Sequence, residues 1–153
     1  MHIEVTTLDQ RERAVAEAVV SVQRPAYAVE AALIGYDQMP GLTEGVEDVM
    51  CLPLTLLGAE AGSQLVGVLG FSDTDSMVEI DRLVVDPAHF RRGVGRRLVS
   101  ALHELAADAG RFDVSTGTEN TPAISLYLAM GYECTRSDVS EGVSLSHFVR
   151  RGE

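Results

Sequence analysis

The sequence has no lysine, only two cysteines and no long uninterrupted apolar run. Cys51 and Cys134 lack the spacing of metal ligands or of a redox pair, so we expect two reduced, buried thiols of a cytosolic protein. Glycine or a charged residue interrupts each apolar stretch before the roughly 18 residues that a membrane span requires. The N-terminus lacks the charged start and apolar core of a signal peptide. These absences predict a cytoplasmic location and no membrane partner.

Basic residues are scarce, and all twelve of them are arginines. The 23 acidic residues give a net charge of −11 at pH 7, whereas a nucleic-acid partner requires a basic face, so the composition argues against one. The acidic excess keeps a protein soluble, and it also favours a cationic substrate. The four histidines, His2, His89, His103 and His147, have no metal-ligand spacing, so no metal site is expected.

The N-terminal part of the chain predicts a strand followed by two helices. Residues 2–6 alternate weakly and are expected to form the strand. Thr7 and Gln10 make a capping-box pattern, which predicts the start of a helix. Apolar residues recur at helical spacing up to Pro25, where we expect this helix to end. A second short helix over residues 27–33 and a loop rich in turn residues would follow.

The rest of the chain of 153 residues alternates strand and helix patterns, which we interpret as one domain, residues 1–153. The complete order is a strand, two helices, three strands, a helix, a strand, a helix and two strands. This order predicts an α/β (α+β) fold with a mixed sheet and helices on both faces. Strands are expected over residues 52–59, 64–71, 77–85, 112–116, 132–138 and 143–150, and helices from Val94 to Gly110 and over residues 121–130.

The most informative stretch is Arg91-Arg92-Gly93-Val94-Gly95-Arg96, which connects a predicted strand to a predicted helix. A helix start presents backbone N–H groups that have no partner within the helix. The glycines let a phosphate approach these groups, and the helix dipole favours its negative charge. The flanking arginines add charge-assisted donors. The segment therefore predicts a diphosphate cradle; the alternative is an ordinary junction with solvated arginines.

Two blocks of the sequence, in this order and at this separation, resemble the GNAT superfamily of N-acetyltransferases. The first block runs from Glu79-Ile80-Asp81-Arg82-Leu83-Val84-Val85-Asp86-Pro87 to the cradle, and the second, residues 120–132, reads Asn, Ala three residues on, Leu-Tyr and Gly-Tyr. Phe90 departs from the family pattern, which usually has Gln or Arg three residues before the first glycine. The resemblance implies a mostly antiparallel central sheet of about seven strands with about four helices on both faces.

The resemblance also implies acetyl-CoA as a co-substrate and no metal. The pyrophosphate would lie on the amides of the cradle, and the pantetheine arm would pair, as an added strand does, with backbone groups freed at a bulge. Asn120 is by default a helix cap, and in the family its side chain also contacts the coenzyme. The implied coenzyme-binding residues are Leu83, Val84, Val85, Arg91, Arg92, Gly93, Val94, Gly95, Arg96, Asn120 and Tyr127.

Two residues are candidates for the proton transfers of such a reaction. A substrate ammonium with a pKa of ~10 must lose a proton before its nitrogen can attack a thioester, and the resemblance assigns this role to Glu79, acting directly or through a water. Asp81, which strand alternation places on the same face, is the substitute candidate. Glu79 is otherwise a solvated strand residue or a partner of Arg82. The resemblance assigns Tyr127 the protonation of the departing thiolate, since phenol and thiol pKa values are close. The alternative for Tyr127 is a core aromatic.

The resemblance predicts acetyl transfer to a primary amine within a ternary complex, with a small-molecule amine favoured over a protein N-terminus or lysine. The rival hypotheses are a catalytically silent coenzyme A-binding module and an enzyme that uses a longer acyl chain; a homodimer is a further option. His147, on the last strand, is a substrate-site candidate. The other residues expected at the acceptor pocket, unless they form a solvated acidic loop, are Tyr27, Glu30, Tyr36, Asp37, Met39, Glu44 and Glu47.

Overall fold

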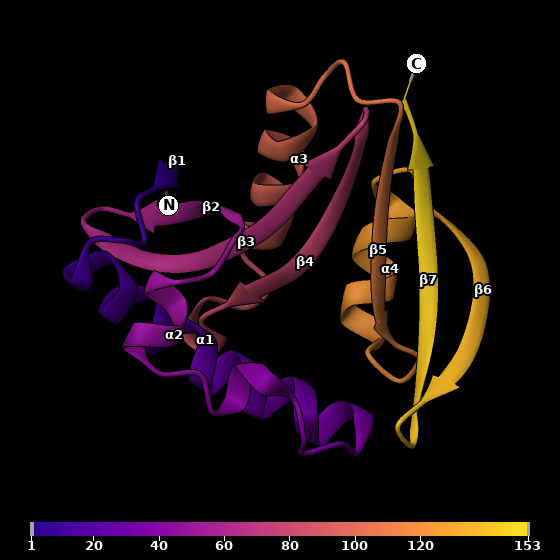
Figure 1. The fold of residues 1–153 in the computed structure, drawn as a ribbon, viewed down its shortest axis with the longest axis horizontal. Coiled ribbons are helices and arrows are strands. Elements are labelled where there is room, and N and C mark those ends of the chain that lie inside the picture. The colour runs from indigo at the N-terminus through magenta and orange to yellow at the C-terminus, as the bar shows by residue number, and fades with distance from the viewer. Residues whose placement is uncertain (1, 153) are drawn as a thin grey trace.

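The computed structural model describes residues 2–152, which form a seven-stranded sheet in the order β1-β2-β3-β4-β5-β7-β6 (Figure 1). All neighbouring strands are antiparallel except β4 and β5, which are parallel. The mostly antiparallel sheet of about seven strands is thus confirmed. The strands are β1 (Ile3–Leu8), β2 (Thr55–Ala61), β3 (Gln64–Thr74), β4 (Met77–Val85), β5 (Arg111–Gly117), β6 (Glu133–Ser140) and β7 (Val143–Arg151).

Helices cover both faces of the sheet, because successive strand residues point to opposite sides. Leu56 of β2 belongs to the core under α1 (Arg13–Ile34) and α2 (Val46–Met50). The next residue, Leu57, belongs to the core under α3 (Val94–Leu105) and α4 (Thr121–Ala129). Within residues 2–152, no helix is long and apolar enough to span a membrane.

The N-terminal helix differs from the one predicted. It begins at Arg13, and the Gln10 side chain, expected in a capping box, donates hydrogen bonds to the carbonyls of Leu52 and Leu54 (3.3 and 2.8 Å). The helix also continues through Pro25 to Ile34, so the separate short helix over residues 27–33 is wrong. A proline inside a helix costs ~3 kcal/mol. Buried apolar residues on both sides of Pro25 pack in one cluster, and this packing offsets the cost.

Downstream, β4 has the predicted bounds, and the other predicted elements match to within a few residues, except that α2 lies in the predicted loop. Both cysteines are exposed, so the expectation of buried thiols is wrong. Cys51 follows the last residue of α2, and Cys134 lies on β6, an edge strand whose residues are all exposed.

β4 and β5 pair only over Met77–Ile80 and Arg111–Val114, and then they separate (Figure 1). A bulge begins the separation: Ile80 lies opposite Phe71 and Arg82 opposite Gly70, so Asp81 is the extra residue. Past the bulge, the edge of β4 that faces β5 has no strand partner among residues 2–152. The fold therefore opens a splayed edge in the middle of its sheet.

Candidate functional site

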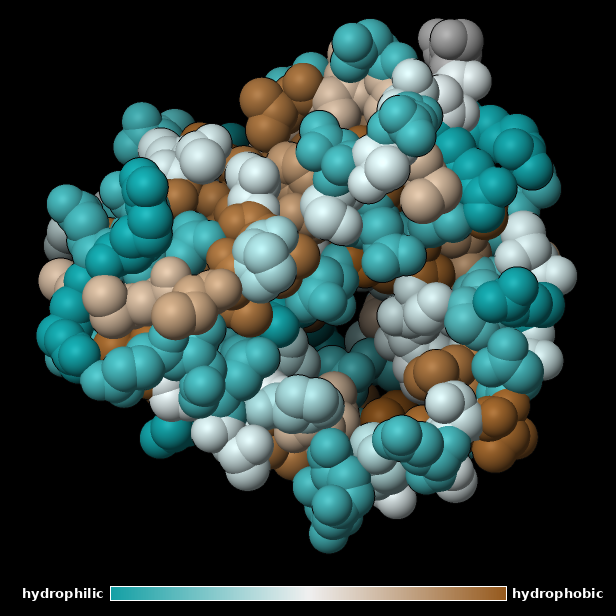
Figure 2. All heavy atoms as spheres, in the orientation of Figure 1, coloured by the Kyte–Doolittle hydropathy of each residue, from teal (hydrophilic) through white to brown (hydrophobic). Residues whose placement is uncertain are grey.

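Two cavities meet where β4 leaves β5. The cradle cavity, about 530 Å³, extends from this point to the start of α3, and the inner cavity, about 390 Å³, lies between α1, β5, α4 and the β6–β7 turn. Figure 2 shows this face of the molecule hollowed near its centre, in the region where Figure 1 shows the two strands diverging. Four residues line both cavities: Glu30, Leu83, Asn120 and Ala123.

The start of α3 presents the backbone groups that the sequence predicts. Gly93 is the N-cap residue with a left-handed φ of 76°, a conformation that favours glycine. The N–H of Arg97 donates to the Gly93 carbonyl (3.0 Å), so the N–H groups of residues 94–96 precede the first bond of the helix and have no partner within it. A Cβ atom on Gly95 would lie 3.2 Å from Leu126 Cδ2, so this position keeps α3 close to α4.

Nearly all the predicted coenzyme-binding residues line the cradle cavity. Two do not: Arg92 is outside its lining, and Tyr127 lines the inner cavity. Apolar residues of α1, which the sequence analysis did not include, form much of the remaining wall, and Phe90 is part of it and 43% exposed. The predicted residues present are Leu83, Val84, Val85, Arg91, Gly93, Val94, Gly95, Arg96 and Asn120.

Contacts within the protein position Asn120, the N-cap residue of α4, and Tyr127, which lies within α4. The Asn120 Oδ1 atom accepts a hydrogen bond from the N–H of Ala123 (3.4 Å), and its Nδ2 donates to Thr116 Oγ1 (3.3 Å). Tyr127 is 3% exposed and lies edge-on to Tyr132, with ring centroids 5.4 Å apart. Burial, and to a lesser extent Tyr132 and Glu30, raises the pKa of Tyr127 well above its ordinary value. Its hydroxyl is therefore protonated at neutral pH but holds its proton more strongly than an ordinary phenol does.

Glu79 and Asp81 occupy different surroundings. Glu79 is exposed and lines a third cavity of about 390 Å³, the polar trough, which runs over β4, β5, β7 and β6. Asp81 lines both the trough and the inner cavity, and its Oδ2 accepts a hydrogen bond from Arg82 Nε (2.7 Å). Glu79 is not in the lining of the cavity that contains Tyr127.

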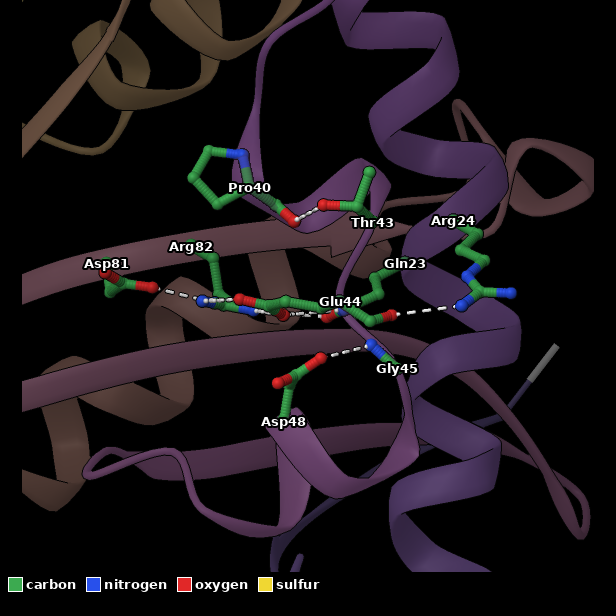
Figure 3. Close-up of polar contacts among 9 residues, drawn as sticks. All are labelled: Gln23, Arg24, Pro40, Thr43, Glu44, Gly45, Asp48, Asp81 and Arg82. Carbon is green, nitrogen blue, oxygen red and sulfur yellow. Dashed lines mark hydrogen bonds and ion pairs between the residues drawn. The ribbon is translucent and has the colours of Figure 1, made fainter.

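A buried ion pair supports the wall of the inner cavity (Figure 3). Arg82 Nη1 lies 2.7 Å from Glu44 Oε1, and the two side chains are only 9% and 13% exposed. Gln23 of α1 donates to the same carboxylate oxygen (2.8 Å). Burial alone would raise the pKa of Glu44, but the hydrogen bonds from Arg82 and Gln23 and the charge of Arg82 lower it on balance. The pair thus ties the loop before α2 to α1 and β4.

The model of the acetyltransferase (GNAT) family matches residues 25–132, more than half of the sequence. The chain belongs to this family. Over 142 residues it is 34% identical to the UPF0157 protein YqkA of Bacillus subtilis, covering 92% of this chain and 41% of YqkA. Over 81 residues it is 35% identical to the N-alpha-acetyltransferase RimI of Mycobacterium tuberculosis, covering 50% of this chain and 51% of RimI. The chain therefore spans between two fifths and about half of these relatives.

Solved structures of the family share the fold. The PaiA N-acetyltransferase from Thermoplasma acidophilum, solved in complex with coenzyme A, superposes with a TM-score of 0.81 at 19% identity, covering 99% of each chain. The ribosomal-protein-S18-alanine N-acetyltransferase from Escherichia coli gives a TM-score of 0.75 at 14% identity, covering 98% of this chain and 94% of that one. At these identities the likeness concerns the fold alone.

The acceptor side of this GNAT fold is only partly as predicted. Tyr27, Glu30, Tyr36 and Met39 line the inner cavity. Asp37, Glu44 and Glu47 lie outside its lining. Glu44 is held by Arg82, and the Glu47 carboxylate pairs with the exposed Arg13 (2.7 Å); Asp37 accepts a hydrogen bond from its neighbour Gln38 (2.9 Å).

The β6–β7 turn and β5 supply cavity residues that the sequence analysis did not single out. Ser140, Glu141 and Val143 line the inner cavity from the turn, and Ser115 from β5. The Tyr36 hydroxyl donates to Glu141 Oε2 (3.4 Å), which connects the segment after α1 to the turn. Strand pairing brings these residues to the cavity from far along the chain, so no local pattern marks them.

His147 lies in the polar trough, in a chain of hydrogen bonds. Its Nδ1 lies 2.6 Å from Ser115 Oγ, and its Nε2 lies 3.1 Å from Asp138 Oδ2. His147 therefore borders the site without lining the cavity that contains Tyr127. Among residues 2–152, no cluster of three or more His, Cys, Asp or Glu side chains is placed to hold a metal ion.

Proposed function

We propose that this protein is an acetyl-CoA-dependent N-acetyltransferase that moves an acetyl group to a primary amine in a ternary complex. The observation that carries the proposal is the continuity of the cradle with the splayed edge of β4. Free N–H groups at the start of α3 open into an elongated cavity, which leads along Leu83, Val84 and Val85 to a second cavity. One cavity suits a long phosphorylated donor and the other suits a separate acceptor.

The cradle supplies three kinds of contact to such a donor. The N–H groups of residues 94–96 and the positive end of the α3 dipole bind the diphosphate, and Arg91 and Arg96 add charged donors from the cavity wall. The unpaired edge of β4 pairs with the amide groups of the pantetheine arm. The apolar wall of α1 and α4 covers the arm and excludes water.

The proposed reaction takes place where the thioester of the donor meets the amine of the acceptor. The amine nitrogen attacks the thioester carbon near Leu83, and an N–H of the Leu83–Val85 run stabilises the developing oxyanion. The Tyr127 hydroxyl donates to the sulfur as the C–S bond breaks. The family resemblance nominates Glu79 as the base, and Glu79 lines the polar trough beside the inner cavity. Holding both reactants in place contributes much of the acceleration.

The acceptor that suits the inner cavity best is a small cationic amine. Tyr27, Tyr36, Glu30 and Glu141 line its walls, which provides aromatic faces and carboxylates for an ammonium group. A second candidate is a protein N-terminus, because one relative is named as an N-alpha-acetyltransferase. The two free cysteines suit work in the reducing cytoplasm.

Two measurements on the purified protein test the proposal. Calorimetric titration with acetyl-CoA should give saturable heat, and coenzyme A thiol should be released when amines are added. The amine panel contains tyramine, spermidine, an alanine-initiated peptide and an acetylated-N-terminus lysine peptide. Heat without thiol release for any amine would favour the silent binding module. No heat at millimolar acetyl-CoA would contradict the function as a whole.

A further inference from the structure

Among residues 2–152, Glu30 is the one ionisable residue that lines both cavities. The buried face of α1 carries Gln23, Ala26 and Tyr27, and Glu30 follows four and three residues after the last two of these, on the same face. Glu30 lines both of the cavities that meet where β4 leaves β5. The other three residues that line both cavities, Leu83, Asn120 and Ala123, do not ionise.

Glu30 also differs from the neighbouring carboxylates in having no protein partner. Asp81 and Glu44 are both held by Arg82, whereas no hydrogen bond or ion pair involves the Glu30 carboxylate within residues 2–152. Burial raises the pKa of Glu30 above its ordinary value. The charge of Glu30 in turn contributes to the raised pKa values of Tyr27 and Tyr127, which indicates that it lies close to both. Glu30 is half-buried, and a partly desolvated carboxylate without a protein partner is suited to bind a cationic ligand.

We propose that Glu30 is the general base that removes the proton from the acceptor amine, an inference that rests on the proposed acetyltransferase function. The position at the junction puts this carboxylate beside the point where an amine in the inner cavity meets a thioester at Leu83. Glu79 lines only the polar trough, and Asp81 already holds Arg82. Glu30 therefore binds the acceptor as an ammonium and converts it to the nucleophile.

The protons and electrons of the step balance. A proton moves from the ammonium nitrogen to a Glu30 oxygen, and the freed lone pair forms the C–N bond. The C–S bond breaks, its electron pair leaves with sulfur, and Tyr127 gives sulfur a proton. The nitrogen loses its second proton as the amide forms, and the Tyr127 oxygen regains one, directly or through water. Glu30 releases the first proton to solvent, so one amide, one thiol and one proton result.

The other charged groups at the site allow a clear pH signature. Besides Glu30, the titratable or charged residues of the inner cavity are Tyr27 of α1 and, from other segments, Tyr36, Asp81, Arg82, Tyr127 and Glu141. On the cradle side, Glu30 is faced by Arg91 and Arg96. Asp81 and Arg82 are paired with each other, Glu141 accepts from Tyr36, and burial raises the pKa values of Tyr27 and Tyr127. His89 faces only the cradle cavity. Activity should thus fall on acidification as Glu30 takes up a proton, and this limb should be absent without Glu30.

The test compares Glu30→Gln with Glu17→Gln, the same substitution at an exposed position of the same helix. Glu30→Gln should lower kcat/KM for the best amine by about 100-fold or more, with the acetyl-CoA dissociation constant within about twofold of wild type. The acid limb of the pH profile should disappear, and Glu30→Asp should restore part of the activity. Glu17→Gln should behave as wild type.

Two readouts do not depend on turnover. A carboxyl ¹³C NMR titration should find one glutamate with a raised pKa, and this signal should be missing in Glu30→Gln. Because the folded-state pKa is raised, the ionised carboxylate opposes folding above its unfolded pKa, and Glu30→Gln should raise Tm at pH 7. Loss of activity with a gain in Tm separates a catalytic role from a structural one.

Each other outcome would overturn the inference in a recognisable way. If the wild type releases thiol but Glu30→Gln keeps kcat/KM within about threefold, Glu30 is not the base. If Glu79→Gln abolishes turnover and Glu30→Gln does not, the base is Glu79. A fall in Tm for Glu30→Gln would make its role structural. A wild type that acetylates no amine would remove the proposed function itself, whatever Glu30 does.

Discussion

The two cavities that meet where β4 leaves β5 differ in which chemical groups form their polar surfaces. The cradle cavity combines backbone N–H groups at the start of α3 and the edge of β4 with a largely apolar wall, to which Arg91, Arg96 and Asn120 add polar side chains. The inner cavity takes its polar groups from side chains, which come from α1, β4, β5, α4 and the β6–β7 turn. A site made of backbone groups can be predicted from one short segment of sequence. A site made of side chains from several elements depends on long-range packing.

The largest effect is expected where the inner cavity depends on one buried ion pair. Arg82→Gln leaves Glu44 buried without its cation, and breaking such a pair costs about 3 kcal/mol of the free energy of unfolding. Urea unfolding at pH 7 measures it. The control is Arg11→Gln, which removes an exposed pair with Asp9 and should change nothing measurable.

A double variant that removes both charges tests whether the loss of stability comes from the single charge that is left buried and unpaired. The double variant Arg82→Gln/Glu44→Gln should lose less stability than the sum of the single variants, since neither charge is then left alone. Equal stability of Arg82→Gln and wild type would mean that the inner cavity does not depend on this pair.

The next effect is on turnover and concerns a side chain of the inner cavity. Tyr127→Phe should lower kcat by about 100-fold, about 2.7 kcal/mol, because the sulfur loses its proton donor. Acetyl-CoA affinity should barely change, since Tyr127 does not line the cradle cavity. Stopped-flow thiol release and calorimetry measure the two quantities. The control is Tyr132→Phe, whose hydroxyl contacts His103 (2.9 Å) away from both cavities. Unaltered turnover would remove Tyr127 from the mechanism.

The contrast also explains how much the sequence could predict. The bounds of β4, the cap of α4 at Asn120 and the glycine-containing start of α3 follow from local patterns, and the structure has them where expected. The extent of α1 does not follow, because Pro25 opposes helix locally and only packing against the sheet outweighs it. The exposure of Cys134 likewise depends on β6 being the edge strand.

The acceptor side shows the same limit for side chains. Glu44 and Glu30 are both acidic residues near α1, and local sequence does not distinguish them. Glu44 is paired with Arg82, which lies 38 residues further along the sequence, and so it does not line the inner cavity. Glu30 forms no ion pair among residues 2–152. A signal for Glu30 exists in the sequence: once α1 is continuous, Glu30 continues the spacing of its buried face. The prediction that the helix ends at Pro25 breaks this spacing, so the pattern is not apparent from the sequence.

A smaller effect is expected from a change at the backbone site. Gly95→Val should weaken acetyl-CoA binding about tenfold, about 1.4 kcal/mol, because a Cβ there already approaches Leu126 and the added methyl groups would cover the N–H groups of the first turn. Calorimetry measures the dissociation constant. Gly45→Ala is the control, since its added Cβ would lie 3.7 Å from Asp48, at the start of α2. Unchanged binding in Gly95→Val would place the diphosphate elsewhere.

The last effect concerns a residue outside both cavities, and its pH dependence has the opposite slope to that of Glu30. Burial, with a contribution from Arg150, lowers the pKa of His103 to about 4. Between pH 6.5 and 4, His103 is therefore protonated in the unfolded chain but largely neutral in the folded protein. The free energy of unfolding falls as the pH falls through this range. Glu30 has a raised pKa and contributes stability on the acid side instead. His103→Gln should thus lose less stability between pH 7.5 and 5 than wild type, by urea unfolding. The exposed His2→Gln is the control, and an unchanged pH difference in His103→Gln would assign the acid sensitivity to another group.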